Sequence, residues 1–412
     1  MRSVINFIKL PNILNLLILA VFIRLLIMPF YFHPDIKEHH FHASFLQKGV
    51  VDIYSYLKQH KEELPIKQDF SYFPLTYFFL GSYQALVSPI LGSDFKSWLF
   101  DASAQSVERI GVFKYLFVLK FPYLVLDLAI AFLLIRFFKE KEDQRKAFIL
   151  WLFNPFSLVL IYLFSNLDII PVLLSLISLL LFNNQRFLLS GLILALAIGF
   201  KAYPILFLPF LLLHIKEFKK TILMLTVTIG TIIATIAPFW STSFLNSALV
   251  SGLTTRLAFP GIPIGFGEAI MVGVVLLSVL FFSTLKFNKN IEGAWYYLLA
   301  VLLIVFSSIH FHIQWLLWII PFLILFHISQ RNQAKLSWIW ISFAFVIPLL
   351  YDDRSMSISL LSIVSPLYNL LPTPFLVLQH FYDPFLVQGI IHSTIFGICL
   401  VIVWRVLKIL KI

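Results

Sequence analysis

The sequence predicts an all-α, polytopic membrane protein, a helical bundle of about 12 transmembrane helices with a long first external loop. Three observations support this fold class. Hydrophobic residues make up 60% of the 412 residues, charged residues make up 12%, and the mean hydropathy is +0.93. Apolar runs recur at lengths comparable to the ~20 residues that a membrane-spanning helix needs. The basic residues gather mainly in short segments between these runs, as in cytoplasmic loops.

The composition also excludes some classes of function. A net charge of +11 would suit a nucleic-acid-binding protein, but the basic residues follow membrane topology, so we expect no nucleic-acid partner. The single cysteine, Cys399, excludes an intrachain disulfide. No small-residue cleavage site follows the first apolar run, which we interpret as a retained signal-anchor helix.

The first predicted span covers residues 12–32. Arg2 and Lys9 precede it, which places the N-terminus in the cytoplasm and the end of the span outside. Residues 33–111 then form the first external loop. Because the predicted spans cross the bilayer, we also expect membrane lipid as a partner.

The external loop is expected to contain polar aromatic helices at 35–48 and 50–60 and an apolar helix at 73–91. We place 73–91 in or dipping into the outer interface. If it crossed the membrane, five basic residues between 136 and 146 would lie outside, against the positive-inside tendency.

Eleven further spans follow, and they leave most of the 31 Lys and Arg residues in short inner segments, with the C-terminus cytoplasmic. Between the last two spans, prolines break residues 352–384 into a second external interfacial segment. The predicted spans are 115–138, 147–164, 169–182, 187–200, 203–213, 221–239, 269–285, 295–309, 313–327, 336–350 and 385–407. Keeping 187–200 and 203–213 as half-length helices puts Lys201 at an outward-facing break, and such breaks often line binding cavities.

The stretch FHPDIKEHHFH, residues 32–42, directly follows the first span. Pro34 fits the first position of a helix, and the helix dipole favours the Asp35 carboxylate in the first turn, so Asp35 should stay ionised. An accessible carboxylate at the mouth of a membrane cavity can act as a general base. The structural alternative is an ordinary aspartate at a helix start.

The sequence has no phosphate loop, and Gly265, Phe266 and Gly267 form only a fragment of a nucleotide-binding pattern. The polar residues suited to chemistry fall on the outer side, where nucleotide-activated donors are not normally present. An activated donor should therefore arrive on a lipid. Lys201 and Arg256, basic residues on the outer side, are then candidates for binding a lipid phosphate, although Lys201 could instead reach the headgroups.

Several segments together carry a family resemblance. They are Asp35, SYFPLTYFFLG (71–81), FNPFSLVLIYLFSNLDIIPVLLSL (153–176), GFKAYPILFLPFLLL (199–213) and HFHIQWLLWIIPF (310–322). In this order they resemble the GT-C class of integral membrane glycosyltransferases, over roughly residues 12–330. The closest likeness is to the polyprenyl-phosphate-sugar-dependent hexosyltransferases of lipid-linked oligosaccharide and GPI-anchor assembly and their bacterial mannosyltransferase relatives.

The resemblance implies one transmembrane glycosyltransferase domain over 1–412, with an extracytoplasmic active site and no cofactor. Asp35 would deprotonate a hydroxyl of the acceptor, which is a lipid-linked or surface glycan or a protein. That hydroxyl attacks the anomeric carbon of the polyprenyl-phosphate sugar donor with inversion while polyprenyl phosphate leaves. Lys201 would lie near the donor phosphate, with Arg256 as a weaker candidate, because negative charge builds up there in the transition state. Asp168 would cap or orient the helix that follows it, and Phe73 stands where relatives often carry a proline.

Other polar residues are weighed from their spacing. Arg24 and Asp127 lie at comparable depth in their spans, and we predict that they form a structural ion pair. His39 and His42 are one helical turn apart, so a metal site is possible, but neutral histidines serve sugar hydroxyls equally well and we expect no required metal. His310 and Gln314, four residues apart, are expected on one helix face. The candidate substrate-binding residues are Lys201, Arg256, Glu38, His39, Tyr72, Tyr203, His310, His312 and Gln314.

Two other functions remain open. A carrier or flippase for a lipid-linked saccharide would need an inverted repeat with paired broken helices, and the sequence indicates one break, at Lys201. A noncatalytic assembly subunit would have an Asp35 pocket without a lipid-accessible opening.

Overall fold

The computed structural model describes residues 7, 12–103, 107, 111–250, 256, 261–285, 291–331 and 334–410. The described residues are mostly helical, with one two-stranded sheet. Five basic residues that orient the predicted spans lie outside the described residues: Arg2, Lys9, Lys286, Lys289 and Lys411.

The chain divides into two compact units. Unit 1 comprises Met1–Phe70, Thr76–Ile169 and Leu349–Tyr382. Unit 2 comprises Ser71–Leu75, Ile170–Pro348 and Asp383–Ile412. Asp35 belongs to unit 1, whereas Lys201 and Arg256 belong to unit 2, and the two units are described separately.

In the first part of unit 1, residues 12–103, two short helices begin where local chemistry favours a helix start. The predicted helix 35–48 corresponds to α3 and η1, and 50–60 corresponds to α4. Pro34 is the first residue of α3, and the His33 ring accepts a hydrogen bond from the Asp35 backbone N–H. The Asp52 carboxylate caps α4 by accepting from the N–H groups of Tyr54 and Ser55. The elements of this region are α2 (Ile13–Ile27), α3 (Pro34–Ala43), η1 (Ser44–Lys48), α4 (Ile53–Gln59), α5 (Pro74–Leu91) and α6 (Asp94–Leu99).

The remainder of unit 1 has one sharp helix break. The predicted span 147–164 begins earlier, at Lys141, and bends by 41° between Leu152 and Pro155. Asn154 explains the break, because its side chain caps the new helix by accepting from the N–H groups of Phe156 and Ser157. The elements are α7 (Val112–Leu134), η3 (Ile135–Phe137), α8 (Lys141–Leu152), α9 (Pro155–Leu158), the π-helical η4 (Val159–Leu163), η11 (Arg354–Met356), η12 (Ile358–Leu361), η13 (Pro366–Leu370) and α20 (Pro374–Gln379).

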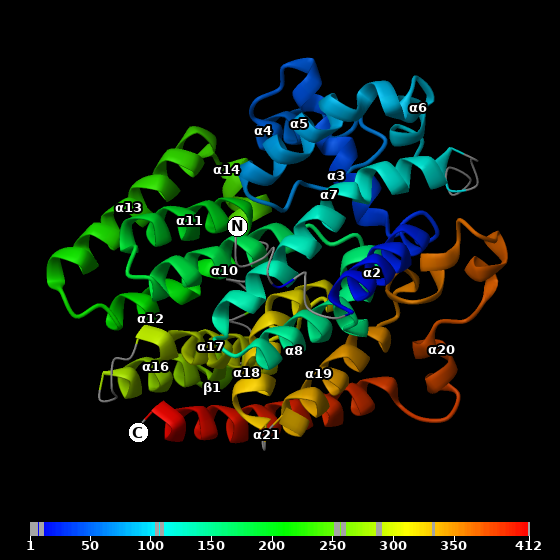
Figure 1. The fold of residues 1–412 in the computed structure, drawn as a ribbon. Coiled ribbons are helices and arrows are strands. Elements are labelled where there is room, and N and C mark those ends of the chain that lie inside the picture. Colours follow the sequence, from blue (N-terminus) through cyan, green and yellow to red (C-terminus); the bar gives the residue numbers. More distant parts are fainter. Residues whose placement is uncertain are drawn as a thin grey trace. The chain divides into compact units, whose positions relative to one another are not determined.

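Unit 2 is built around helices that are apolar on all sides. Every residue of α17 (Ala294–Ser308) is buried, as expected for a helix without a polar face, and α17 packs against α21 (Pro384–Leu410). α11 (Phe187–Phe200) and α13 (Phe218–Ile236) lie side by side (Figure 1). Gly191 permits this packing, since a Cβ there would lie 2.8 Å from Thr228 Oγ1.

Most of the other elements of unit 2 overlap the predicted apolar runs, and three short ones, at 242–244, 245–249 and 291–293, lie outside them. The other elements are α10 (Ile169–Asn183), which starts at the unit boundary, η5 (Tyr203–Phe207), α12 (Leu208–Leu213), η6 (Ala237–Phe239), α14 (Thr242–Phe244), η7 (Leu245–Leu249), α16 (Val272–Thr284), η8 (Ile291–Gly293), η9 (Ile313–Trp318), α18 (Ile320–Ser329) and α19 (Ala334–Leu349). The predicted boundary between 187–200 and 203–213 is confirmed by the break between α11 and η5.

The predicted start of the span 269–285 is wrong. Residues Gly261–Gly265 (β1) and Glu268–Met271 (β2) pair as an antiparallel hairpin, and α16 begins only at Val272. Phe266 and Gly267, at the tip, both have positive φ, which a tight two-residue hairpin turn of type I′ requires. The fragment Gly265, Phe266, Gly267 therefore forms part of a hairpin turn.

Within the part of the chain that the structure describes, four helices are long and apolar enough to cross a membrane: Val112–Phe137, Phe218–Phe239, Ile291–Ser308 and Pro384–Leu410. The bent pair Lys141–Leu152 and Pro155–Leu163 raises the number to five if it forms one span. The other seven predicted spans correspond to shorter apolar helices, so the total of about 12 stays a prediction. Among the described helices α5 falls below the hydropathy of a span, and its interfacial position also stays a prediction.

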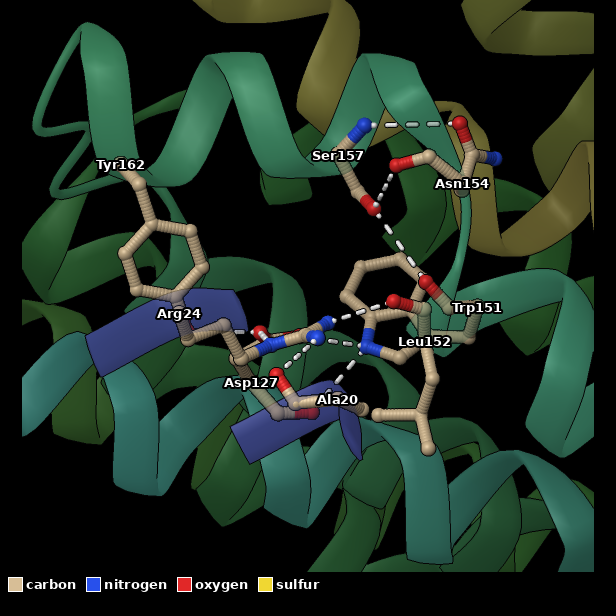
Figure 2. A network of polar contacts seen from close by, with 8 residues as sticks. All are labelled: Ala20, Arg24, Asp127, Trp151, Leu152, Asn154, Ser157 and Tyr162. Atoms are coloured by element: carbon tan, nitrogen blue, oxygen red, sulfur yellow. Dashed lines mark hydrogen bonds and ion pairs between the residues drawn. The ribbon is translucent and has the colours of Figure 1, made fainter. Parts of the chain in front are cut away.

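A buried ion pair joins several helices of unit 1 (Figure 2). The predicted pairing is present: Arg24 Nε lies 2.5 Å from Asp127 Oδ2, and both side chains are 0% exposed. Arg24 also donates to the carbonyls of Ala20 and Leu152, each at 2.9 Å. Trp151 Nε1 and the Tyr162 hydroxyl donate to the Asp127 carboxylate, both at 2.7 Å. Both charges are thus paired and hydrogen-bonded, which their burial requires.

We expect Arg24→Met to destabilise the protein by about 3–5 kcal/mol, because it leaves the Asp127 carboxylate buried without its counter-charge. The double variant Arg24→Met/Asp127→Leu should be more stable than Arg24→Met alone. The measurement is thermal unfolding of the purified protein in detergent. If the stability loss of the double variant equals the sum of the losses of Arg24→Met and Asp127→Leu measured singly, the two side chains are not coupled.

Candidate functional site

Two carboxylates lie one turn apart on α3, in unit 1. Asp35 is in the first turn, its side chain is 35% exposed, and the His33 Nδ1 atom lies 3.4 Å from Asp35 Oδ1. Glu38 follows three residues later and is less exposed than a surface residue. Side chains three residues apart share a helix face, so the two carboxylates lie close enough to interact.

The two carboxylates interact electrostatically. Burial, followed by the negative charge of Asp35, raises the pKa of Glu38 to about 7. Glu38 therefore exchanges a proton near neutral pH, which an ordinary glutamate does not. This is the type of perturbed carboxyl group that is found at functional sites, although structural clusters also produce it.

A cavity of about 360 Å³ adjoins this turn of α3. The volume is within the range of small-molecule sites. Glu38 lines the cavity directly, and Lys37 does so as well, with its ammonium group donating to the Asp101 carbonyl at 2.5 Å. The lining residues are Phe32, Pro34, Lys37, Glu38, Pro65, Ile66, Gln68, Ala102, Ser103 and Val107.

The histidines of α3 point mainly into the protein. His39, His40 and His42 are buried, and burial lowers the pKa values of His40 and His42 to about 3, so both stay neutral. The structure therefore places His39 in a mostly buried position, not in an open binding surface. Within the described ranges, no group of three or more His, Cys, Asp or Glu residues could hold a metal ion.

A lysine that the sequence analysis did not consider fixes the chain just before α3. Lys120, fully buried in α7, donates to the carbonyls of Tyr31 at 2.6 Å and Tyr162 at 2.7 Å. One residue after Tyr31, the Phe32 N–H donates to the Leu360 carbonyl. Lys120 could have been singled out from the sequence, because a lysine inside a predicted membrane span is rare and needs a partner.

A second cluster, in unit 2, gathers around Lys201 at the break between α11 and η5. The Lys201 ammonium lies 3.9 Å from the centre of the Tyr72 ring and 5.8 Å from the Trp315 ring. At these distances the ring faces attract the cation. Tyr72, predicted as a substrate-binding residue, is thus brought to Lys201 from a distant part of the sequence.

Arg256 approaches the same indole. Its guanidinium carbon lies 4.9 Å from the Trp315 ring, one guanidinium nitrogen lies 3.0 Å from His312 Nε2, and the other donates to the His310 carbonyl at 3.3 Å. Burial, followed by the positive charges of Arg256 and then His392, lowers the pKa of His310. Lys201 and Arg256 therefore place two positive charges on one aromatic side chain.

A stack of three rings backs this cluster. Tyr203 stacks on Trp318 at 3.9 Å with an angle of 6° between the rings, and Trp318 stacks on Trp315 at 5.2 Å. Because Tyr203 is only 1% exposed, it contributes packing and presents little surface to a ligand in this conformation.

His310 and Asp168 each lie just before a helix. His310 precedes η9, which begins at Ile313, so His310 and Gln314 do not share a helix face as predicted. Asp168 is fully buried directly before α10, and its backbone N–H donates to Asn166 Oδ1 at 2.9 Å. Its predicted capping role remains a prediction.

The comparisons with known proteins concern this second cluster most directly. Residues 116–318 match the family model of glycosyltransferase family 87. The matched stretch is just under half of the chain and includes Lys201, Arg256 and Trp315. Asp35 and Tyr72 lie outside it. Among curated proteins, none matches the chain.

The match to glycosyltransferase family 87, together with the apolar helices, supports a membrane protein with glycosyltransferase activity. It agrees with the GT-C class to which the sequence motifs pointed.

The raised pKa of Glu38 predicts a pH-dependent stability. A carboxyl group whose pKa is raised on folding stabilises the folded state below its ordinary pKa of 4.5, and this contribution is lost as the pH rises through about 7. Relative to Glu38→Gln, the wild type should lose about 1–2 kcal/mol between pH 4.5 and 8, after allowance for solvent screening.

The measurement is thermal unfolding in detergent across this pH range. Glu63→Gln, at an exposed position of the same loop, is the matched control and should follow the wild type. Parallel stability curves for the wild type and Glu38→Gln would contradict the assignment.

Proposed function

We propose that the protein transfers a hexose, with mannose as the first sugar to test, from a polyprenyl-phosphate-linked donor to an acceptor at the extracytoplasmic membrane face, with inversion. The observation that carries the proposal is the pair of cations, Lys201 and Arg256, held on the Trp315 indole inside the stretch that matches the glycosyltransferase family.

The cations suit the leaving group of this reaction. As the glycosidic bond breaks, negative charge accumulates on the departing phosphate, and positioned cations stabilise that charge. The Lys201 and Arg256 side chains bring N–H donors of two geometries, the three of an ammonium and the planar fork of a guanidinium. Rings fix both cations in place before the donor binds, which lowers the ordering cost of binding.

Asp35 supplies the base in this proposal. Its carboxylate accepts the proton of the acceptor hydroxyl, the oxygen attacks the anomeric carbon, and the bond from that carbon to the phosphate oxygen breaks. Polyprenyl phosphate leaves with the electron pair. The partial exposure of Asp35 and the neighbouring cavity support access by a hydroxylated acceptor.

A carrier for a lipid-linked saccharide is the second candidate. The helix break at Lys201 favours it, because transporters also bind substrates at broken helices. A carrier would move the lipid-linked sugar across the bilayer of reconstituted vesicles without transferring the sugar.

Asp35→Asn should lower sugar transfer by about 10²–10⁴-fold, the usual contribution of a general base, while the protein still folds. The assay uses purified protein in nanodiscs with radiolabelled polyprenyl-phosphate mannose, glucose and galactose and a membrane acceptor extract. Asp69→Asn, an exposed aspartate of the same loop, is the control. Full activity of Asp35→Asn would remove Asp35 from the base role, and sugar-lipid movement without transfer by the wild type would favour the carrier.

Lys201→Met and Arg256→Met should each lower kcat/KM for the donor by about 10²–10³-fold, because each removes charge stabilisation of the leaving phosphate. Lys201→Arg, which keeps the charge, should retain more activity than Lys201→Met. Lys216→Met removes an exposed lysine of unit 2 elsewhere and serves as the control. Donor kinetics that do not distinguish Lys201→Met from Lys216→Met would argue against a phosphate site.

A further inference from the structure

The first external loop contains a second pocket, separate in its lining from the cavity beside Glu38. It has a volume of about 390 Å³ and lies wholly within unit 1. Residues of η1, the C-terminal half of α5, the turn at Gly92 and α6 form its walls. We refer to it as the η1–α6 pocket.

The η1–α6 pocket concentrates positive charge. Lys48 and Lys96 both line it, and the described lining contains no aspartate or glutamate. The Lys48 ammonium lies 4.6 Å from the Phe45 ring and 4.8 Å from the Phe100 ring. Burial, followed by the positive charge of Lys96, lowers the pKa of Lys48. An anion bound between the two lysines would relieve their mutual repulsion.

A third lysine, Lys114, lies beside the turn at Gly92. The turn at Gly92 has φ +82°, a conformation that favours glycine, and a Cβ there would lie 3.9 Å from Lys114 Nζ. The Lys114 ammonium donates to the Leu91 carbonyl at 3.3 Å, which ties the start of α7 to this turn.

The neutral polar groups of the pocket offer mainly acceptors. The Ser44 hydroxyl donates to the Phe41 carbonyl, the Ser88 hydroxyl donates to the Ala85 carbonyl, and the Ser93 hydroxyl donates to the Asp94 carboxylate. Each hydroxyl has a single proton, so its oxygen is left to accept from a ligand. Ligand hydroxyl groups are the natural donors to these oxygens.

Glutamines hold one wall in place. Gln84 is buried and donates to the His40 carbonyl at 3.1 Å, while its side-chain oxygen accepts from Gln47 at 3.1 Å. The Gln47 side-chain oxygen and its second N–H can then serve a ligand. The same α3 backbone that carries Glu38 is thus connected to the η1–α6 pocket.

We propose that the η1–α6 pocket binds a polyol that carries a phosphate group, with the anion on Lys48 and Lys96 and the hydroxyl groups on the serine oxygens. Two sources share this chemistry, the headgroup of an anionic lipid and a phosphorylated saccharide. The exposed side chains of Leu86 and Ile90, on the helix that supplies Ser88, would suit a lipid surface beside the pocket.

The test uses the full-length protein in phosphatidylcholine nanodiscs and glycerol 1-phosphate as the probe, with binding measured by calorimetry. Lys96→Gln should weaken binding about tenfold, and Lys48→Gln/Lys96→Gln about 100-fold, as expected for the loss of one and two charge-assisted hydrogen bonds. Lys58→Gln, an exposed lysine on α4 outside the pocket, should bind as the wild type does.

Because Lys48 packs on two rings, its replacement could disturb folding. If the double variant unfolds, the binding affinity of Lys96→Gln, a change at an exposed position, tests the proposal. Phosphatidylglycerol in the nanodiscs should compete with the probe if a lipid is the source, and glucose 6-phosphate should bind better than the probe if a saccharide is. Absence of probe binding in phosphatidylcholine, or equal binding by Lys96→Gln and Lys58→Gln, would overturn the proposal. Neither result depends on glycosyl transfer.

Discussion

The buried Arg24–Asp127 pair is the constraint on which the geometry of unit 1 depends. In an apolar interior both charges must be paired and their remaining hydrogen-bonding capacity used, and here α2, α7, α8 and η4 each supply a partner. Lys120 extends this arrangement by binding the carbonyl at Tyr31, only four residues before Asp35. The position of the proposed base is therefore set by polar contacts within the apolar helices, and not by the loop alone.

Local chemistry explains which parts of the fold could be predicted from the sequence. The start of α3 follows from Pro34, and the break between α11 and η5 follows from the interruption of an apolar run near Lys201 and Pro204. The hairpin before α16 could not be predicted in this way. Its second strand continues directly into the apolar helix, so hydropathy does not separate them, and the deciding feature is the positive φ of Phe266 and Gly267.

In the candidate site too, features set by local sequence could be predicted and features set by contacts between distant residues could not. Lys201 could be selected from its place at a helix break, but its contact with Tyr72 joins residues far apart in the sequence, which no local pattern encodes. Likewise, the sequence alone shows that Asp35 and Glu38 are three residues apart. The pKa of Glu38 depends first on burial, which is a property of the folded protein. The role of Lys120 was also non-local, since both of its partners are backbone carbonyls on other elements.

In unit 1, the contacts of the cations distinguish the structural Arg24 and Lys120 from Lys48, the candidate ligand-binding cation of the η1–α6 pocket. Arg24 directs its guanidinium to a carboxylate and two carbonyls, and Lys120 directs its ammonium to two carbonyls, so both bind the fold itself. Lys48 instead lies over the Phe45 and Phe100 rings. A ring face attracts a cation without accepting a directional N–H bond from it, and this positions the charge of Lys48 while its donors can still turn toward an anion. In unit 2, Lys201 also lies over an aromatic ring, that of Tyr72, and the Trp315 ring lies close to both Lys201 and Arg256, so two positive charges are gathered where we propose the donor phosphate.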